Sequence, residues 1–207
     1  MSKQVLKIVG LGLAVAISLP ASAITYVLNN GGGAFPNPGN YGTVDLVQSG
    51  ANVDFTVTLA AGFNFVTTGN QNSHSTFTFN STGVALADIV NIADATPVAG
   101  EYGAWTPAGN SPFGDFTWGI HCTACSNGSG GQQADPLTFR VINAVIADFQ
   151  SLSTGGTAAY FAADVITGST TGAVGVTVPA IPEPETYALM LAGLAAVGFM
   201  ARRRRQA

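Results

Sequence analysis

The stretch Val53-Asp54-Phe55-Thr56-Val57-Thr58-Leu59 decides the fold class of this chain. Apolar and polar side chains alternate along the whole stretch, which is the period of a β-strand with one buried face. Shorter runs repeat the pattern in Phe77-Thr78-Phe79, Phe116-Thr117-Trp118 and Leu137-Thr138-Phe139-Arg140-Val141. Threonine takes many of the outward positions, so we expect strands with a polar but mostly uncharged exposed face.

Clusters of Gly, Asn, Ser and Pro separate these runs and supply the turns between strands. The spacing predicts an all-β body, an antiparallel β-sandwich of jelly-roll-like form. The expected strands cover residues 25–28, 42–47, 53–59, 63–66, 75–79, 116–120, 137–142, 159–165 and 174–178.

Two segments do not fit a simple strand pattern. Residues 84–93 place Leu86, Ile89, Val90 and Ala93 at helical spacing, which predicts a short helix. Residues 141–149 fit either a strand or one helical turn.

The chain has 207 residues, of which only 9% are charged, and its formal net charge is −4. Its basic residues gather at the two ends, and Arg140 stands alone between them. Residues 24–178 therefore hold one basic and nine acidic side chains, a formal charge of −8. A body with a single arginine cannot neutralise a row of phosphates, which excludes nucleic acid as a partner.

Residues 1–23 have the three parts of a secretory signal peptide. Lys3 and Lys7 form the positive region, and residues 8–19 form a short apolar region. Ala21-Ser22-Ala23 has the small-x-small pattern that signal peptidase accepts, so we expect cleavage before Ile24. The alternatives are an uncleaved anchor and a buried core helix. Export would bring the two cysteines into an oxidising compartment.

The composition changes after Pro179. Pro182-Glu183-Pro184 disfavours helix, because proline lacks an amide donor and restricts the residue before it. Residues 187–201 carry no charge and predict one short transmembrane helix. Arg202, Arg203, Arg204 and Arg205 follow, and the positive-inside rule places them on the cytoplasmic side. We therefore divide the chain into a signal peptide (1–23), a β-sandwich body (24–178) and a tail (179–207).

This tail resembles the PEP-CTERM sorting signal of Gram-negative bacteria. The resemblance rests on Pro182-Glu183-Pro184, the apolar segment 187–201 and the arginine cluster 202–205, in that order. It implies that an exosortase processes the chain near the Pro-Glu-Pro motif, after the precursor has been held transiently in the inner membrane. It also implies a place at the cell surface or in the extracellular matrix, among exopolysaccharide and biofilm. The alternative is a single-pass anchor that is retained uncut.

Cys122-Thr123-Ala124-Cys125 is the most conspicuous chemical feature of the body. Two cysteines in an exported chain predict a local disulfide. A redox pair would need the first cysteine at a helix N-terminus, and glycine and serine follow the second one here. A Cys2His2 zinc site with His74 and His121 is the metal alternative, but His121 and Cys122 are neighbours and would point to opposite faces of a strand. We expect no metal and no cofactor.

The sequence offers little catalytic chemistry. His74 and His121 are interpreted as ordinary surface or loop residues, and no serine lies in a nucleophile-elbow motif. A glycosidase needs two carboxylates across a cleft, whereas Glu101 is the sole glutamate of the body. Asp115, Asp135 and Asp164 are each explained as turn or strand-end residues. Calcium bound by loop oxygens is left open, because sequence alone does not show such a site.

The aromatic residues supply the remaining functional hypothesis. Tyr102 and Trp105 lie in a loop-like setting among Gly and Pro and are the candidates for stacking on sugar rings. The first hypothesis is a non-enzymatic, exported surface or matrix protein, processed by signal peptidase and exosortase and associated with exopolysaccharide. The second is a secreted carbohydrate-binding module. The third is a secreted hydrolase.

Overall fold

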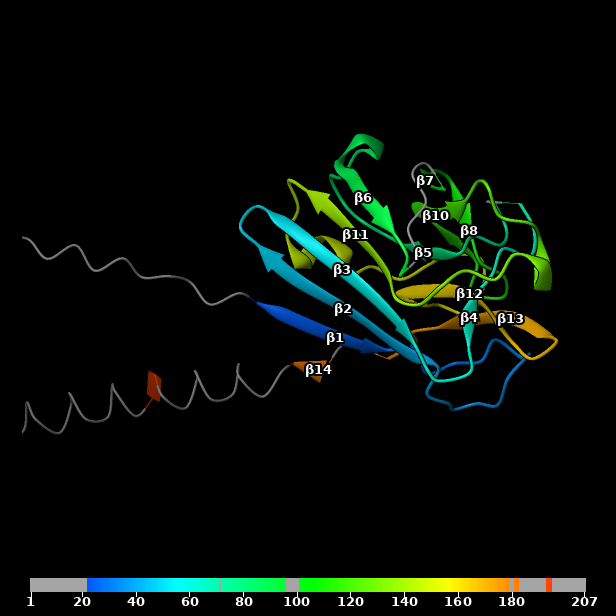
Figure 1. Cartoon of the computed structure of the whole chain (residues 1–207). Helices are drawn as coiled ribbons and strands as arrows, with labels where there is room; N and C mark the ends of the chain where they lie inside the picture. Colours follow the sequence, from blue (N-terminus) through cyan, green and yellow to red (C-terminus); the bar gives the residue numbers. More distant parts are fainter. Residues whose placement is uncertain (1–21, 71, 96–100, 179–180, 183–192, 195–207) are drawn as a thin grey trace, which may run out of the picture.

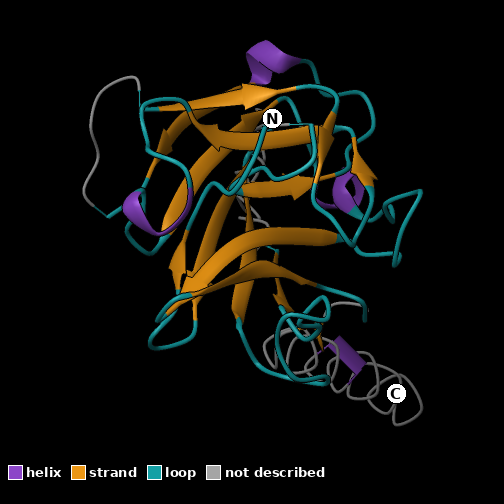
Figure 2. Cartoon of the chain, turned by 90° about the vertical axis from the view of Figure 1, so that its right-hand side faces the viewer, coloured by secondary structure: helices purple, strands orange, loops and turns teal. Residues whose placement is uncertain are grey.

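The computed structural model describes residues 22–70, 72–95, 101–178, 181–182 and 193–194, and its β-strands form two main antiparallel sheets (Figure 1). Strands dominate the described chain, and its helical segments are short 3-10 turns (Figure 2). The prediction of an all-β, antiparallel body is therefore confirmed.

The first sheet has the order β14-β1-β2-β3-β11-β6. Its strands are β1 (Ala23–Val27), β2 (Gly42–Ser49), β3 (Asn52–Leu59), β6 (Ile89–Ala93), β11 (Leu137–Ile142) and β14 (Ile181–Pro182). Strands β1, β2 and β3 form a meander, and the alternating stretch Val53–Leu59 lies in β3, inside the sheet.

The second sheet has the order β13-β12-β5-β10-β7, with β4 added on β12. Its strands are β4 (Asn64–Phe65), β5 (Phe77–Phe79), β7 (Tyr102–Trp105), β10 (Trp118–Cys122), β12 (Phe161–Thr167) and β13 (Thr170–Gly175). The short strands β8 (Ala108–Gly109) and β9 (Asp115–Phe116) pair with each other. From β5 onward the chain passes back and forth between the two main sheets.

Phenylalanine side chains join the two sheets. Phe55 of β3 stacks on Phe139 of the adjacent β11, with ring centroids 4.4 Å apart. Across the sandwich, the ring centroid of Phe55 lies 5.6 Å from that of Phe79 in the second sheet. The Phe149 ring also contacts Phe55, at a centroid distance of 4.9 Å. All of these rings are buried. The alternating phenylalanines of separate strands therefore converge on one core, which is how two half-buried sheets become stable.

The outer face of the first sheet carries threonine and a few charges, as the alternation predicts. Thr25, Asp45, Thr56 and Thr138 occupy one row across four strands. In the next row Arg140 forms a two-point ion pair with Asp54, with N···O distances of 2.6 and 2.8 Å. Arg140 is the single basic side chain among the described residues, and this pairing occupies it.

Loops cover the outer face of the second sheet. Ala162 and Ala173 on that face are buried beneath Phe113 and Phe116, forming a small second core. Ser153 donates a hydrogen bond to the carbonyl oxygen of Phe113 at 2.6 Å, which ties the loop before β12 to the β8–β9 hairpin. This covering layer forms the walls of a polar cleft beside the β8–β9 hairpin.

Several elements differ from the sequence-based expectation. The helix expected over residues 84–93 is wrong: the chain makes a 3-10 turn, Leu86–Asp88, and then β6. Tertiary pairing with β11 overrides the helical spacing of the apolar residues. Residues 141–149 contain the end of β11 and a 3-10 turn, Ile146–Phe149.

The two expected membrane-directed segments lie almost wholly outside the described residues. The signal segment 1–21 is outside them, and so are the predicted span 187–201, except residues 193–194, and the arginines 202–205. Within the described part of the chain, no helix is long and apolar enough to cross a membrane.

Candidate functional site

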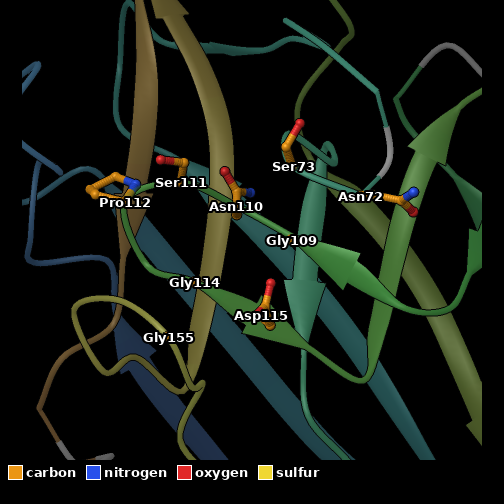
Figure 3. A pocket seen from close by; sticks show the side chains of 9 residues that line it. All are labelled: Asn72, Ser73, Gly109, Asn110, Ser111, Pro112, Gly114, Asp115 and Gly155. Atoms are coloured by element: carbon orange, nitrogen blue, oxygen red, sulfur yellow. The ribbon is translucent and has the colours of Figure 1, made fainter.

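A polar cleft of about 150 Å³ opens beside the β8–β9 hairpin. Its walls come from the hairpin and from two loops that pack against it (Figure 3). The lining residues are Asn72, Ser73, Gly109, Asn110, Ser111, Pro112, Gly114, Asp115 and Gly155. Binding residues are often carried on loops that a rigid scaffold positions, which makes this cleft a candidate site.

Glycines let the walls of the cleft approach each other. Gly114 has a positive φ of 87°, and a Cβ there would overlap the carbonyl oxygen of Thr154. A Cβ at Gly109 would overlap the backbone of Asn72. The backbone of Asp115 exchanges hydrogen bonds with that of Thr154 at 2.7 and 3.2 Å. The cleft is thus built from backbone contacts, and side-chain oxygens remain to face a ligand.

Asn110 and Asp115 supply the free oxygens. The Asn110 side chain is fully buried and donates from Nδ2 to the carbonyl oxygen of Ser75 at 2.9 Å. Its Oδ1 atom has no hydrogen-bond partner among the described residues. A buried carbonyl oxygen without a donor is unfavourable, so this atom retains an unused capacity to accept a hydrogen bond. The Asp115 side chain is exposed at the same cleft.

Trp105 does not line the cleft itself but is tied by a hydrogen bond to Asn72, which does. Its indole is 43% exposed, and its Nε1–H donates to Oδ1 of Asn72 at 3.1 Å. Because Asn72 lines the cleft, this hydrogen bond fixes the ring beside the polar groups. An indole whose donor is already satisfied presents its apolar face to solvent, and that face is the part that stacks on a sugar ring.

Tyr102, the other candidate for stacking, lies on the opposite face of β7. It packs against the main core, and its hydroxyl donates to Oδ2 of Asp94 at 3.1 Å. Burial, together with the charge of Asp94, raises the pKa of the Tyr102 hydroxyl. The structure therefore separates the two aromatic residues, and of the two only Trp105 is bonded to a residue of the cleft.

A buried polar cluster lies between the second sheet and its covering loops. Asp164 of β12 is fully buried and accepts two hydrogen bonds from Thr68, from the backbone N–H at 2.9 Å and from Oγ1 at 2.5 Å. Burial raises the pKa of Asp164 to about 6, while the Thr68 bonds and the charge of His74 act in the opposite direction. His74, expected to be an ordinary surface or loop residue, has a buried Nδ1 atom.

Cys122 and Cys125 are joined in a disulfide, with Cα atoms 5.5 Å apart. Glu101, which sequence reasoning had not linked to the cysteines, places Oε1 3.8 Å from Cys122 Sγ and 3.6 Å from Cys125 Sγ. These three residues form the group of potential metal ligands found in the described chain, and neither histidine belongs to it. Because the sulfurs are bonded to each other, they do not offer the thiolates that a metal needs.

The second histidine, His121, precedes Cys122 on β10. Its Nδ1 atom is buried without a hydrogen-bond partner among the described residues, and burial lowers the pKa of the imidazole. His121 is half-buried within a strand, which departs from the loop position expected of it.

Replacing both cysteines by serine is expected to lower the free energy of unfolding by about 2 kcal/mol and to leave the fold intact. The loop that they close is short, so the disulfide removes little chain entropy from the unfolded state. Denaturant unfolding of the double variant measures this loss. The oxidised wild-type body should also weigh about 2 Da less than the reduced one. An unshifted mass would show free thiols and would make the Glu101, Cys122, Cys125 group a candidate metal site.

The sorting residues predicted from the sequence lie at the end of the described chain. Ile181 and Pro182 form β14, which pairs with the first strand of the body, whereas Glu183 and Pro184 lie outside the described residues. Ala23, at the expected signal-peptidase site, begins β1, and Ala21 lies outside the described residues.

Comparison with known proteins identifies the tail. No curated protein and no solved structure matches the chain. A family model described as the PEP-CTERM protein-sorting motif matches residues 180–205, which include Pro182-Glu183-Pro184 and the arginine cluster. The chain therefore carries a PEP-CTERM sorting motif, which indicates an exported protein that is sorted through a membrane-anchored precursor and processed by exosortase.

Proposed function

We propose that the body is a non-enzymatic extracellular protein that associates with exopolysaccharide at the cell surface or in the biofilm matrix. The observation that carries the proposal is the exposed Trp105, whose indole N–H donates to Asn72, a lining residue of the polar cleft. This arrangement combines one apolar ring face with several hydrogen-bonding groups. A sugar ring has the matching surface, because its C–H face is apolar and its hydroxyls lie around the edge.

The charge of the body favours an uncharged polysaccharide. Asp115 is the single ionisable side chain among the described lining residues, and it is acidic. The one basic side chain of the described body, Arg140, is paired with Asp54 on the first sheet. A polyuronate would meet repulsion without a counter-charge, whereas a neutral glycan would not.

The composition of the cleft also favours binding over hydrolysis. Glycoside hydrolysis uses two carboxyl groups, either close together or separated by the space for a water molecule. Asp115 has no second carboxylate among the described residues that line the cleft. We therefore favour a binding role over the hydrolase alternative.

Binding should be lost when the ring face is removed. Trp105→Ala is expected to weaken retention on a gel that carries exopolysaccharide from the native host by at least about tenfold, because stacked aromatic anchors contribute most to such contacts. Affinity electrophoresis or gel retention of the purified body measures the change. A neutral β-glucan and a polyuronate serve as reference polymers, and only the former should retain the wild type.

Leu86→Ala is the matched control, since Leu86 is 45% exposed on the 3-10 turn Leu86–Asp88 and does not line the cleft. It should bind as the wild type does. Trp105→Phe keeps an apolar ring but loses the bond to Asn72, so partial retention is expected. Equal retention of wild type and Trp105→Ala, with unchanged unfolding curves, would contradict a role of this cleft in polysaccharide binding.

A further inference from the structure

The start of the sorting motif is part of the folded body. Strand β14 consists of Ile181 and Pro182, and the family match begins at residue 180. These two residues pair antiparallel with Thr25 and Ile24 of β1. In the sheet order β14 is the end strand, so its other edge carries no further strand of the described chain (Figure 1).

The register brings the two processing sites together. The Cα partner of Pro182, the first residue of Pro-Glu-Pro, is Ile24, the residue before which signal peptidase is expected to cut. In an antiparallel pair, the beginning of one strand lies beside the end of the other. The N-terminal segment thus enters the body, and the C-terminal segment leaves it, at the same end of the first sheet.

Pairing also sets the length of free chain between the body and the predicted membrane span. With β14 in place, five peptide steps separate Pro182 from Tyr187, a reach of about 17 Å when extended. Before β14, the last hydrogen bond to the body among the described residues comes from the backbone N–H of Thr177, which donates to Asn29 Oδ1 at 2.9 Å. If β14 detaches, the free chain starts near Thr177 and reaches about 33 Å.

We propose that the β1 edge at Ile24–Thr25 is a docking site for the sorting segment of the same chain, and that this docking restrains exosortase. A protease binds its substrate as an isolated extended strand, so residues paired with β1 must first leave the sheet. The folded body also stands within about 17 Å of the predicted span and obstructs a membrane-embedded enzyme until β14 is released.

The docking is suited to reversible release. Only two residue pairs hold β14, and Pro182 has no N–H to donate to the ladder. A short end strand of this kind opens more readily than the core strands. Opening therefore gates access to the Pro-Glu-Pro motif without unfolding the sandwich.

A cysteine pair tests the docking directly. Thr25 and Ile181 are Cα partners, and directly opposed residues of antiparallel strands lie within the Cα separation that a disulfide spans. In the exported full-length chain, Thr25→Cys with Ile181→Cys should cross-link, as non-reducing peptide mapping would show. Pulse-labelling in the native host, followed by intact mass, should show at least about fivefold slower conversion of precursor to processed protein.

The matched control is Val27→Cys with Ile181→Cys. Val27 lies on the same face of β1 two residues further on, so this pair is out of register, should stay reduced and should be processed at the wild-type rate. Reducing agent added to membranes that hold the cross-linked precursor should restore processing.

Three outcomes would overturn the proposal. The first is absence of the Thr25–Ile181 cross-link in a precursor whose body unfolds as the wild type does. The second is a cross-linked precursor that is processed at the normal rate. The third is slow processing that reduction does not relieve, since the substitutions themselves would then be the cause. Polysaccharide binding at the Trp105 cleft plays no part in any of these readouts.

Discussion

Phe55→Ala is expected to lower the free energy of unfolding by about 4 kcal/mol, enough to threaten a domain of ordinary stability. Phe55 is buried and lies at the centre of the aromatic cluster, in contact with Phe79, Phe139, Phe149 and Phe161. Alanine would remove the ring from both sheets at once. The rigid neighbouring rings cannot close the resulting cavity fully, so the loss includes a cavity penalty as well as the transfer free energy.

Equilibrium unfolding in urea, monitored by tryptophan fluorescence, measures this change. Thr56→Ala is the matched control, because the next residue of β3 points to the outer face and its loss should cost less than about 1 kcal/mol. Equal stability of the two variants would contradict the assignment of the Phe55 face to the core. A variant that is less stable but unfolds with an unchanged m-value would support it.

The same alternation explains why much of the fold could be predicted from the sequence. In β2, β3 and β11 every second residue is buried, because each strand packs one face on the core and leaves the other to solvent. An alternating pattern can be seen within one short stretch of sequence, so it predicts a strand without knowledge of the partner strand. The strand β6 lacked such a pattern: its residues resemble a helical repeat, and its conformation depends on pairing with β11, almost fifty residues later in the chain.

The candidate site was predictable only in part. Trp105 was identified from its Gly- and Pro-rich surroundings, but Tyr102 belongs to the core, because strand alternation places positions 102 and 105 on opposite faces of β7. Nothing in the sequence linked Asn72 to Asn110 and Asp115, since the loop of Asn72 and the β8–β9 hairpin that carries the other two meet only in the folded chain. The pairing of β14 with β1 was equally hidden, because it joins the two ends of the chain.

Asp164 was interpreted from the sequence as a turn or strand-end residue, yet it lies within β12 and is fully buried. One carboxylate oxygen, Oδ2, accepts both bonds from Thr68, and the other, Oδ1, has no hydrogen-bond partner among the described residues. Burial opposes the charged form and outweighs the Thr68 bonds and the charge of His74, so the pKa of Asp164 rises to about 6.

Stability should therefore fall as pH rises across this range. The pKa of Asp164 is higher in the folded state than the ordinary value of 3.8, so the folded state holds the proton more tightly than the unfolded state. The stabilising contribution of the protonated carboxyl is complete below about pH 4 and is lost as pH rises through about 6. The rise in pKa corresponds to a loss of about 2 kcal/mol between pH 4 and pH 7.5.

Asp164→Asn should abolish this contribution, because an amide keeps an acceptor for both Thr68 bonds and does not titrate. The quantity to measure is the difference in unfolding free energy between variant and wild type, from urea titrations at pH 4 and pH 7.5. That difference should shift by about 2 kcal/mol in favour of the variant at the higher pH. Burial also raises the pKa of Asp135 and lowers the pKa of His121. Both groups titrate in the variant and in the wild type, so their contributions cancel in the difference between the two proteins.

Thr56→Ala on the outer face of the first sheet is the control, since it removes no ionisable group. Its stability curve should run parallel to that of the wild type over the same pH range. If the stability curve of Asp164→Asn also ran parallel to that of the wild type, the ionised form of Asp164 would not destabilise the fold. That result would require a hydrogen-bond partner for Oδ1, such as the imidazole of His74. A shift confined to Asp164→Asn would identify this buried carboxyl as a group that makes the exported body more stable in acid than at neutral pH.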